Sequence, residues 1–321
     1  MNKALKISVI VLASVLSFVL LVWGGLWIAR AIVYRDYLAN KETVCKIPAL
    51  GDGFVPQGFA TTEAGVYLHS GYDGKTNEMR LFLVAEDDSK ELIPTDADGN
   101  RLEGHGGGIA WAGDFVYVAS EAKLILFRYA DFKNARDGDR VQCISTFEVD
   151  TEASFCFADA SFLYVGEFYR AEDYETDPSH YFTTPDGTEN RALMSAYRLA
   201  PDGSLADVYP TYSLSIPHQV QGFATKGETV MLSRSWGVSS SKLDFYRGMK
   251  DSGQTVDVSG KTVPLYYLDS TNHEKTVRLP AFSEGLAVEG DRVLISFESA
   301  CNKYVIGKLF FANKVVSYPI P

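Results

Sequence analysis

Five short segments of this chain repeat one another, and their spacing constrains the fold more than any other feature of the sequence. Each places a small residue before an apolar residue and an alanine, at positions 57–60, 107–110, 155–158, 221–224 and 284–287. In four of them nine residues separate the glycine from the centre of the next apolar run, and in the third eight residues separate Cys156 from that centre. Repeats of roughly 50 residues, each too short to bury its own apolar face, are typical of propellers and solenoids.

Each repeat unit reads as four strands, because runs of β-branched and aromatic residues alternate with turns rich in Gly, Asp and Asn. In the second unit we expect strands at 108–111, 115–120, 124–129 and 141–147, with a tight turn at 112–114. No long helical period interrupts these runs. The sequence therefore predicts an all-β fold, a five-bladed β-propeller that occupies residues 43–321.

The third and fourth units are longer than the first two. Aligned positions are 50 and 48 residues apart in the first two units and 66 and 63 residues apart in the next two. The additional residues fall at 171–191 and 248–260, whose composition predicts loops outside the strands. A sixth blade within these long units is the alternative count.

A ring of blades must close, and propellers often close by letting a strand from one terminus complete the blade formed by the other. We expect residues 43–50 to supply the outer strand of the last blade. Cys45 and Cys301 would then lie in one blade, which predicts a disulfide that locks the ring. Cys143 and Cys156 flank the junction of blades two and three and form a second candidate pair, unless Cys156 is a buried small residue in a glycine position.

Before the propeller, residues 7–29 contain 23 positions without a charge, which at about 1.5 Å per residue span roughly 35 Å. This length is enough to cross the core of a bilayer. The alternative is a cleaved signal peptide, since residues 1–6 are basic and 29–31 match a small-x-small cleavage pattern. A secretory apolar run is only about 7 to 15 residues long, and Trp23 and Trp27 lie where an interfacial belt is expected. We therefore predict a retained transmembrane signal-anchor.

The head that follows the juxtamembrane linker, residues 30–42, is acidic. Four of the chain's 30 basic residues precede Asp36, so 26 remain against 41 acidic residues, a net charge of −15. This balance disfavours nucleic acid as a partner and adsorption to an anionic lipid surface. Basic residues flank the span on both sides and orient it only weakly, whereas an extracytoplasmic head would free the cysteines to pair. We expect a single-pass protein of the cell membrane with its propeller on the extracytoplasmic side.

Two sets of polar residues are expected to meet at one end of the central channel. The first strand of each blade lines the channel, and antiparallel pairing brings its start beside the end of the second strand. Buried polar groups need partners, water or a ligand, so this end is a candidate binding site. The alternative is that these groups bond one another and close the channel. The ligand-binding candidates are Gln57, Tyr72, His105, Glu167, Gln221, Arg234, Ser235, Glu284 and Glu298.

Four of these side chains point to specific chemistry. The planar fork of Arg234 suits a carboxylate, phosphate or sulfate, or a salt bridge to Glu284 or Glu298. The two glutamates come from the two inner strands of the last blade, where a carboxylate pair would bind Ca²⁺ or perform acid–base catalysis. His105 lies in a glycine run, where it would bind a ligand or act as a base, unless the glycines merely reflect crowding at the axis. The sequence contains no Gly-x-Ser-x-Gly elbow and no zinc motif.

Several strings in this chain resemble a group of secreted or membrane-anchored bacterial propeller proteins that has no assigned activity. The likeness covers most of residues 45–321, and the strings are Pro56-Gln57-Gly58, His105-Gly106-Gly107, Val165-Gly166-Glu167-Phe168, Ser233-Arg234-Ser235-Trp236-Gly237, Ser283-Glu284-Gly285 and Phe297-Glu298-Ser299-Ala300. More remotely, the Glu-Gly start of an inner strand resembles gluconolactonase-type hydrolases, esterase-like phytases and calcium-activated apyrases. That resemblance implies pore carboxylates that hold calcium, and only Glu284 matches the pattern, as the one candidate metal ligand.

These observations together predict a membrane-anchored extracytoplasmic propeller whose polar channel mouth binds a small or extended ligand. The expected partners are the membrane, through the N-terminal helix, and a small molecule, a glycan or an envelope protein, and no cofactor is expected. One alternative is a calcium-dependent hydrolase of a lactone, ester or phosphoester, with Glu284 and Glu298 around the ion and His105 as the base. The other is an envelope scaffold for protein–protein contacts.

Overall fold

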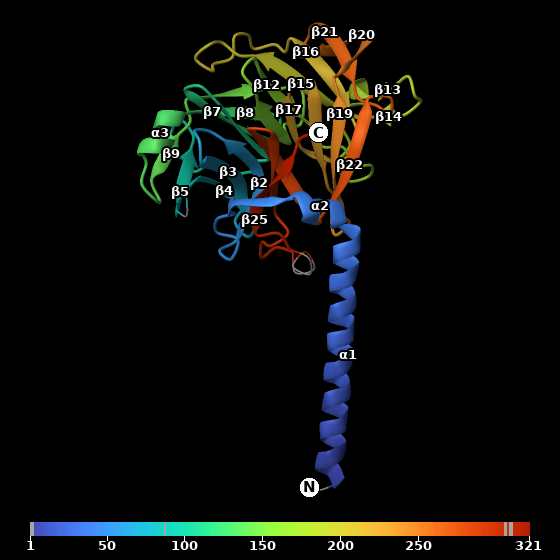
Figure 1. The fold of residues 1–321 in the computed structure, drawn as a ribbon. Helices are drawn as coiled ribbons and strands as arrows, with labels where there is room; N and C mark the ends of the chain where they lie inside the picture. The colour runs from blue at the N-terminus through green and yellow to red at the C-terminus, as the bar shows by residue number, and fades with distance from the viewer. Residues whose placement is uncertain (1–2, 87, 305–306, 308–310) are drawn as a thin grey trace.

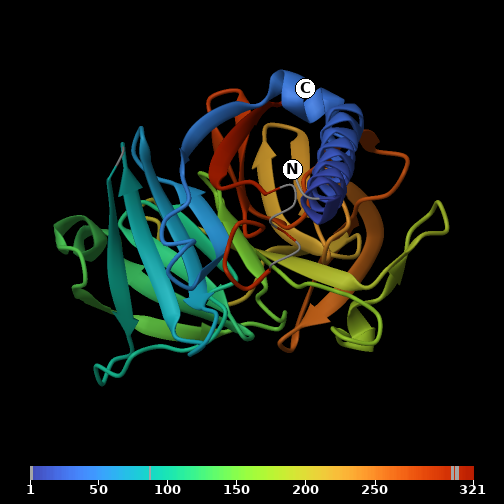
Figure 2. The same ribbon diagram turned by 90° about the horizontal axis from the view of Figure 1, so that it is seen from below.

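The chain folds into an N-terminal helix and five small sheets arranged in a ring. The computed structural model describes residues 3–86, 88–304, 307 and 311–321. Each sheet is one blade, and the first strands of the five blades contact one another around the axis (Figures 1 and 2). This arrangement confirms the predicted five-bladed β-propeller, and within the described ranges the two long units add no sixth blade.

Blades one and two follow the repeat. Blade one contains β2 (Phe54–Thr61), β3 (Val66–Asp73), β4 (Met79–Ala85) and β5 (Asp88–Thr95). Blade two contains β6 (Gly108–Ala112), β7 (Phe115–Ser120), β8 (Lys123–Arg128) and β10 (Ser145–Glu148), with the short helix α3 (Tyr129–Asn134) between β8 and β10.

The strand expected at 141–147 is two strands in different blades. β9 (Arg140–Gln142) pairs in parallel with β5 of blade one, and only β10 pairs with β8 of blade two. The Cys143 amide donates to the Thr95 carbonyl of blade one (2.8 Å), and the next amide, that of Ile144, donates to Leu126 of blade two (2.7 Å). The chain therefore crosses between the blades at this point.

Blades three and four each carry an insertion. Blade three contains β11 (Phe155–Ala158), β12 (Phe162–Gly166), β15 (Ala192–Arg198) and β16 (Tyr212–Ile216). Blade four contains β17 (Val220–Lys226), β18 (Thr229–Arg234), β19 (Ser241–Arg247) and β22 (His273–Leu279). The insertion at 171–191 holds the 3₁₀ turn η1 (Pro178–His180) and a small hairpin of β13 (Phe182–Thr183) and β14 (Glu189–Asn190).

The insertion at 248–260 is mostly a strand, so the loop predicted there is wrong. β20 (Lys250–Val258) and β21 (Lys261–Tyr267) form a hairpin, and β21 pairs in parallel with β16 at the outer edge of blade three. Val258 and Val263 are buried in a cluster with Phe182 and Leu193. The hairpin thus covers a sheet edge that would otherwise expose unpaired backbone groups.

Blade five closes the ring with a strand from the other end of the chain, as predicted. It contains β23 (Ser283–Glu289), β24 (Arg292–Phe297) and β25 (Lys314–Pro319). The N-terminal β1 (Glu42–Lys46) pairs antiparallel with β25 and becomes the outermost strand. Backbone hydrogen bonds therefore hold the two ends of the propeller together.

The predicted disulfides do not form, since all four cysteines are described, buried and unbonded. Cys45 lies on the outermost strand of blade five, whereas Cys301 follows β24, and β25 lies between those two strands. Cys143 and Cys156 pack in two different apolar clusters. A disulfide needs Cα atoms within about 7 Å, and sharing a blade or a blade junction does not provide that proximity.

The repeated glycines have a steric cause at the axis. A Cβ atom at Gly58 would lie 2.5 Å from the amide nitrogen of Ile109, and one at Gly285 would lie 2.5 Å from that of Phe59. Any larger residue at these positions would therefore push neighbouring inner strands apart. The close approach of the inner strands explains why the repeat is detectable in the sequence.

Helix α1 (Lys3–Val33) projects from the propeller and is apolar between Leu5 and Val33, with a mean hydropathy of 2.6 (Figure 1). Its length and composition suit a membrane anchor or a signal sequence. The segment expected to be a linker is largely helical, because α2 (Arg35–Asn40) follows α1. Tyr37 of α2 is buried, with its ring centroid 6.5 Å from that of Phe297 in blade five.

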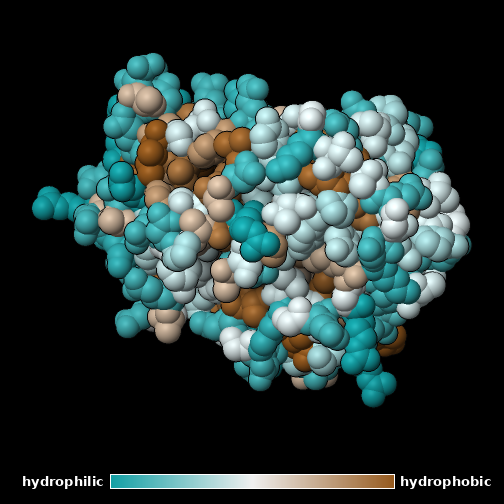
Figure 3. Space-filling view, turned by 90° about the horizontal axis from the view of Figure 1, so that it is seen from above, coloured by the Kyte–Doolittle hydropathy of each residue, from teal (hydrophilic) through white to brown (hydrophobic). Residues whose placement is uncertain are grey.

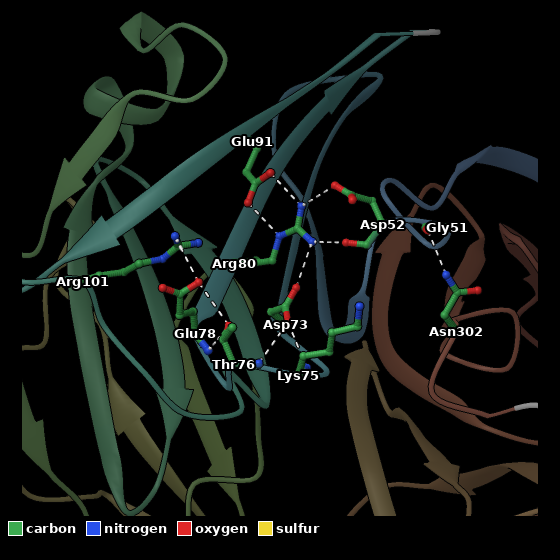
Figure 4. Close-up of polar contacts among 10 residues, drawn as sticks. All are labelled: Gly51, Asp52, Asp73, Lys75, Thr76, Glu78, Arg80, Glu91, Arg101 and Asn302. Carbon is green, nitrogen blue, oxygen red and sulfur yellow. Dashed lines mark hydrogen bonds and ion pairs between the residues drawn. The ribbon is translucent and has the colours of Figure 1, made fainter.

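A buried ion cluster fixes the loop before β2 to blade one (Figure 4). The Arg80 guanidinium donates to both carboxylate oxygens of Glu91 at 2.7 Å and to the backbone carbonyl of Asp52 at 2.7 Å. Asp73 lies 3.8 Å from the same group. The cluster holds this loop beside the end of the channel where β2 begins and β3 ends.

Candidate ligand-binding site

A cavity of about 580 Å³ occupies one end of the central channel. Its wall is formed by residues at the starts of inner strands, at the ends of second strands, and in the loops after β12, β18 and β24. The structure brings together seven of the nine predicted ligand-binding residues in this wall: Gln57, Tyr72, His105, Gln221, Ser235, Glu284 and Glu298. The channel is therefore open at this end, rather than closed by bonds among these side chains.

Glu284 and Glu298 form a pair of buried carboxyl groups in the cavity wall. Their side chains come from the start of β23 and the residue after β24, and the residues are 2% and 5% exposed. Burial and the charge of Glu298 raise the pKa of Glu284 well above its ordinary value. Burial raises the pKa of Glu298 to about 8. Burial therefore favours the protonated form of both carboxyl groups.

The hydrogen bonding of this pair is incomplete. The Gln57 amide donates to Glu298 Oε2 (2.9 Å) and to the Pro56 carbonyl (3.0 Å). Glu284 Oε1 is buried and has no hydrogen-bond partner among the described residues. An unsatisfied buried oxygen costs about 1–3 kcal/mol. Because Glu284 lines the cavity, its incompletely bonded carboxyl group is a candidate contact for a ligand.

Lys303 is the one basic residue in the cavity wall, as far as the described residues show. Its ammonium group donates to the Tyr72 hydroxyl and lies over the rings of Tyr72 and Tyr304, 4.9 and 5.5 Å from their centroids. Its charge opposes the rise in the pKa of Glu298 but does not outweigh burial. Lys303 and Tyr304 come from the loop after β24, which has no counterpart in the repeat, so sequence analysis did not single them out.

His105 lies at the rim, with its ring centroid 4.8 Å from that of Tyr72. Burial by its neighbours and the charge of Lys303 lower its pKa, so the imidazole is neutral near pH 7. A Cβ atom at Gly107 would lie 2.4 Å from the Ser154 carbonyl oxygen. Crowding at the axis therefore accounts for part of the glycine run around His105.

Arg234 and Glu167 do not line the cavity. The Arg234 guanidinium donates to the His218 carbonyl (2.8 Å) and pairs with Asp244 (3.1 Å), rather than with Glu284 or Glu298. Glu167 is buried beside His180, with 2.9 Å between its carboxylate and Nδ1, and accepts the Leu193 amide at 2.7 Å. Desolvation raises the pKa of Glu167, while that of His180 is also raised because its carboxylate partners outweigh burial. Arg234 and Glu167 therefore both have partners within the fold.

Aromatic rings from loops complete the wall. Phe168, Tyr174 and Trp236 contact one another with centroid distances of 5.4 to 5.9 Å. Phe282 stacks on Tyr304 at 4.6 Å. Tyr174 belongs to the insertion at 171–191, so part of that insertion borders the cavity. Phe168 and Trp236 each directly follow a predicted polar position and belong to strings that carry the family resemblance, but neither was predicted to contact a ligand.

The rim of the cavity is acidic. Four carboxylates lie there in addition to the buried pair, and Asp173 among them is paired with Arg170, whose guanidinium covers one face of Trp236 at 4.3 Å. The four are Glu121, Glu152, Asp173 and Glu175. A wall of this charge disfavours an anionic ligand, for which the expected cation, Arg234, is turned away.

The described residues do not reproduce the pore carboxylates that the remote resemblance implies for calcium. Ca²⁺ takes six to eight oxygen ligands, several of them usually carboxylates. Only Glu284 and Glu298 converge at the channel end, both with raised pKa values, and no group of three or more His, Cys, Asp or Glu side chains within the described ranges is placed to hold a metal.

Comparison with known proteins does not assign this chain to a family. No protein-family model and no curated protein sequence matches this chain. Among solved structures, the chain is similar to a GH43_1 enzyme from Xanthomonas citri complexed with xylose (10% identity, TM-score 0.44, 90% of this chain and 92% of that one). It is also similar to RS223 β-xylosidase (8% identity, TM-score 0.40, 87% and 94%) and to Kuenenia stuttgartiensis hydrazine synthase (12% identity, TM-score 0.34, 84% and 88%). These values identify no family.

Proposed function

We propose that this chain is a membrane-anchored, extracytoplasmic receptor that binds an uncharged, hydroxyl-rich ligand, such as a saccharide, in its axial cavity. The observation that carries the proposal is the buried Glu284 oxygen without a partner, in a cavity wall that it shares with Glu298. A protonated carboxyl group both donates and accepts a hydrogen bond. Sugar hydroxyls do the same, so a neutral carboxyl pair complements them without the cost of burying charge.

The remainder of the wall supports the same class of ligand. Small-molecule sites are mostly apolar and aromatic, with a few placed polar groups, and here Trp236, Phe168 and Tyr174 supply rings beside the amides of Gln57 and Gln221. Aromatic rings pack against the apolar faces of sugar rings. The acidic rim disfavours phosphate or carboxylate groups, and this favours a neutral saccharide over the anionic ligands that Arg234 suggested.

Helix α1 supports retention at a membrane. Its uncharged stretch of 23 residues, 7–29, is longer than a secretory apolar region, and none of its most apolar window is buried against the propeller. An extracytoplasmic position of the head would give the cavity access to glycans of the cell envelope.

Calorimetric titration of the full-length protein in detergent micelles with a panel of neutral di- and trisaccharides tests the proposal. We expect saturable binding by at least one saccharide and a loss of at least tenfold in affinity in Glu284→Leu, which keeps a side chain of similar size but has neither a donor nor an acceptor. Glu289→Leu is the matched control, because Glu289 is exposed at the other end of the same strand. Absence of binding across the panel, or equal losses in both variants, would reject the proposal.

The carboxyl pair also supports a second candidate, an acid–base hydrolase. A protonated Glu298 is poised to donate a proton to a leaving group at neutral pH, and neutral His105 is able to accept one. Chromogenic glycosides, esters, phosphoesters and lactones, assayed with calcium and with chelator, test this candidate. Turnover that is lost in Glu298→Gln and kept in Glu289→Gln would support the hydrolase. Saccharide binding without turnover would reject the hydrolase and support the receptor function.

A further inference from the structure

Contacts on both sides fix the junction between α1 and the propeller. Tyr34, directly after α1, is buried, and its hydroxyl lies 3.0 Å from Ser240 Oγ. Asp36 of α2 forms an ion pair with Lys275 (2.9 Å) and accepts a hydrogen bond from the Tyr318 hydroxyl (2.9 Å). A single residue separates α2 from β1. The direction of α1 relative to the ring is therefore set by folded contacts rather than by a flexible linker.

Helix α1 leaves the propeller at the end where the cavity opens. Ser240 belongs to the turn between β18 and β19, and Ser235, Trp236 and Gly237 of the same turn line the cavity. Figure 1 shows α1 extending away from this end, and Figure 2 views the ring from the same side, with α1 pointing toward the reader. Figure 3 shows the opposite end, where hydrophilic residues form most of the outline and apolar residues gather in a hollow at the upper left.

The length of α1 places this end close to lipid headgroups. Residues 7–26 would fill a hydrocarbon core of about 30 Å. Trp27 would then lie in the interface, with the Arg30 guanidinium 5.0 Å from its ring centroid. From Trp27 to Tyr34 the helix rises only about 10 Å, which is close to the thickness of one headgroup layer, about 5–8 Å. The mouth of the cavity would therefore face the headgroups directly.

Side chains at the end of the propeller where the cavity opens suit a position next to lipid headgroups. Val238, beside the cavity, and Phe311, after β24, are 63% and 51% exposed. Next to Phe311 lies a groove of about 600 Å³ whose lining includes Leu50 and the two lysines Lys46 and Lys314. Exposed apolar and basic side chains favour contact with the interfacial region of a bilayer. These side chains lie at the same end as the acidic rim of the cavity.

We infer that the cavity opens toward the bilayer in which α1 is anchored, and that its ligand is the uncharged saccharide headgroup of a glycolipid in that membrane. The inference rests on the proposed saccharide binding and specifies that the saccharide belongs to a lipid of the same membrane. A receptor and a ligand confined to one membrane surface meet at a high effective concentration, which compensates for modest contact energy. The acidic rim would at the same time reject anionic headgroups.

The orientation is tested with nitroxide labels on the full-length protein in phosphatidylcholine vesicles that contain a nickel-chelating lipid as relaxation agent. Val238→Cys carries the label beside the cavity, and Glu228→Cys, in the β17–β18 turn at the far end of the same blade, is the matched control. Both positions are exposed and the four native cysteines are buried. We expect several-fold stronger relaxation at position 238. Equal relaxation, or stronger relaxation at position 228, would overturn the inference.

The ligand is tested by the emission of Trp236 in a full-length variant in which Trp23, Trp27 and Trp111 are replaced by phenylalanine. The variant is placed in vesicles of phosphatidylcholine alone, with a dihexosyl diacylglycerol, or with phosphatidylglycerol, and is also titrated with the free disaccharide of the same headgroup. We expect saturation by the glycolipid at a concentration about tenfold below that of the free disaccharide, and no response to phosphatidylglycerol. A Gly–Ser insertion after Tyr34, which frees the head from α1, should abolish the difference between the two sugar sources.

The outcomes separate this inference from the proposed function. Binding of the free disaccharide that equals or exceeds binding of the glycolipid would overturn the membrane source and leave saccharide binding intact. A response to phosphatidylglycerol alone would overturn both. Loss of the glycolipid response in Glu284→Leu but not in Glu289→Leu would place the headgroup in the axial cavity, whereas an unchanged response in Glu284→Leu would overturn the inference.

Discussion

Two buried charge clusters in this propeller are satisfied to very different degrees. In blade one, the Arg80 guanidinium has a bidentate carboxylate, a backbone carbonyl and a further carboxylate around it (Figure 4). In the axial cavity, Glu298 receives one amide from Gln57, and Glu284 Oε1 receives nothing from the described residues. The first cluster is complete within the fold. The second is incompletely bonded and lies in the wall of the axial cavity, which is why we propose a function for it.

The largest expected effect is on stability, in Arg80→Met. Removal of the buried guanidinium leaves the Glu91 and Asp73 carboxylates, 26% and 21% exposed, without their partner. Loss of hydrogen bonds to charged groups costs about 1.5–3 kcal/mol. Denaturant unfolding of the full chain measures the change. Arg101→Met is the control, because the Arg101–Glu78 pair is partly exposed and such pairs contribute about 0–1 kcal/mol. Similar losses of unfolding free energy in the two variants would mean that the Arg80 cluster stabilises the protein no more than the Arg101–Glu78 pair does.

The second prediction concerns the pH dependence of stability. The pKa of Glu298 is raised in the folded state from its ordinary 4.5 to about 8, so the native protein retains a proton that the unfolded chain releases. The contribution of Glu298 to the free energy of unfolding is therefore fully present below about pH 4.5. It is lost as the pH rises through about 8, which lowers the free energy of unfolding by a few kcal/mol.

Glu298→Gln tests this prediction, because the amide cannot ionise and should reduce the dependence of the melting temperature on pH above about 4.5, while the raised pKa of Glu284 maintains part of the slope. Glu289→Gln should keep the wild-type slope. If the melting temperature of the wild-type protein rises between pH 5 and pH 8 and Glu298→Gln removes that rise, the carboxyl group is ionised in the folded state and the contrast with the Arg80 cluster fails.

The third effect is on binding. Trp236→Ala removes an aromatic face of the cavity and should weaken saccharide affinity by about tenfold, or about 1.4 kcal/mol, without altering the pH profile. Trp111→Ala, on the first strand of blade two and away from the cavity, should leave affinity unchanged in the same calorimetric titration. Equal effects of the two substitutions would indicate that the aromatic wall does not contact the ligand.

The smallest effect is expected from reductant. Burial raises the pKa of Cys45 and Cys156 to about 12, and the thiols are unbonded. Addition of a reductant should leave the melting temperature unchanged, and all four thiols should react with a maleimide in denaturant without prior reduction. A native disulfide contributes about 2–4 kcal/mol, so a clear drop in melting temperature would contradict the structure.

The sequence predicted the ring well because the repeat itself has a physical cause. Glycines such as Gly58 and Gly285 recur since no Cβ atom fits where inner strands touch. Polar residues that start one strand and end the next are then brought to the same end of the channel by antiparallel register, and this placed Gln57, Glu284 and Glu298 correctly in the cavity wall.

The two misplaced candidates differ from wall residues by one position. Ser235 and Phe168 line the cavity, whereas Arg234 and Glu167, the residues just before them, do not. Successive side chains of an extended chain point to opposite faces, so an uncertainty of one residue at a strand end reverses the direction of a side chain. The repeat and the alternation of side chains along strands do not predict the positions of Tyr304 and the other loop residues, because those positions depend on tertiary contacts.

The most direct measurement of the central claim is infrared difference spectroscopy of the carboxyl groups at neutral pH. The account predicts a carbonyl band from protonated carboxyl groups in the wild-type protein at pH 7, diminished in Glu284→Gln and in Glu298→Gln, unchanged in Glu289→Gln, and shifted when a saccharide binds. Absence of that band at pH 7 would show that both glutamates are ionised, and it would contradict the account of the cavity as a neutral, incompletely bonded site.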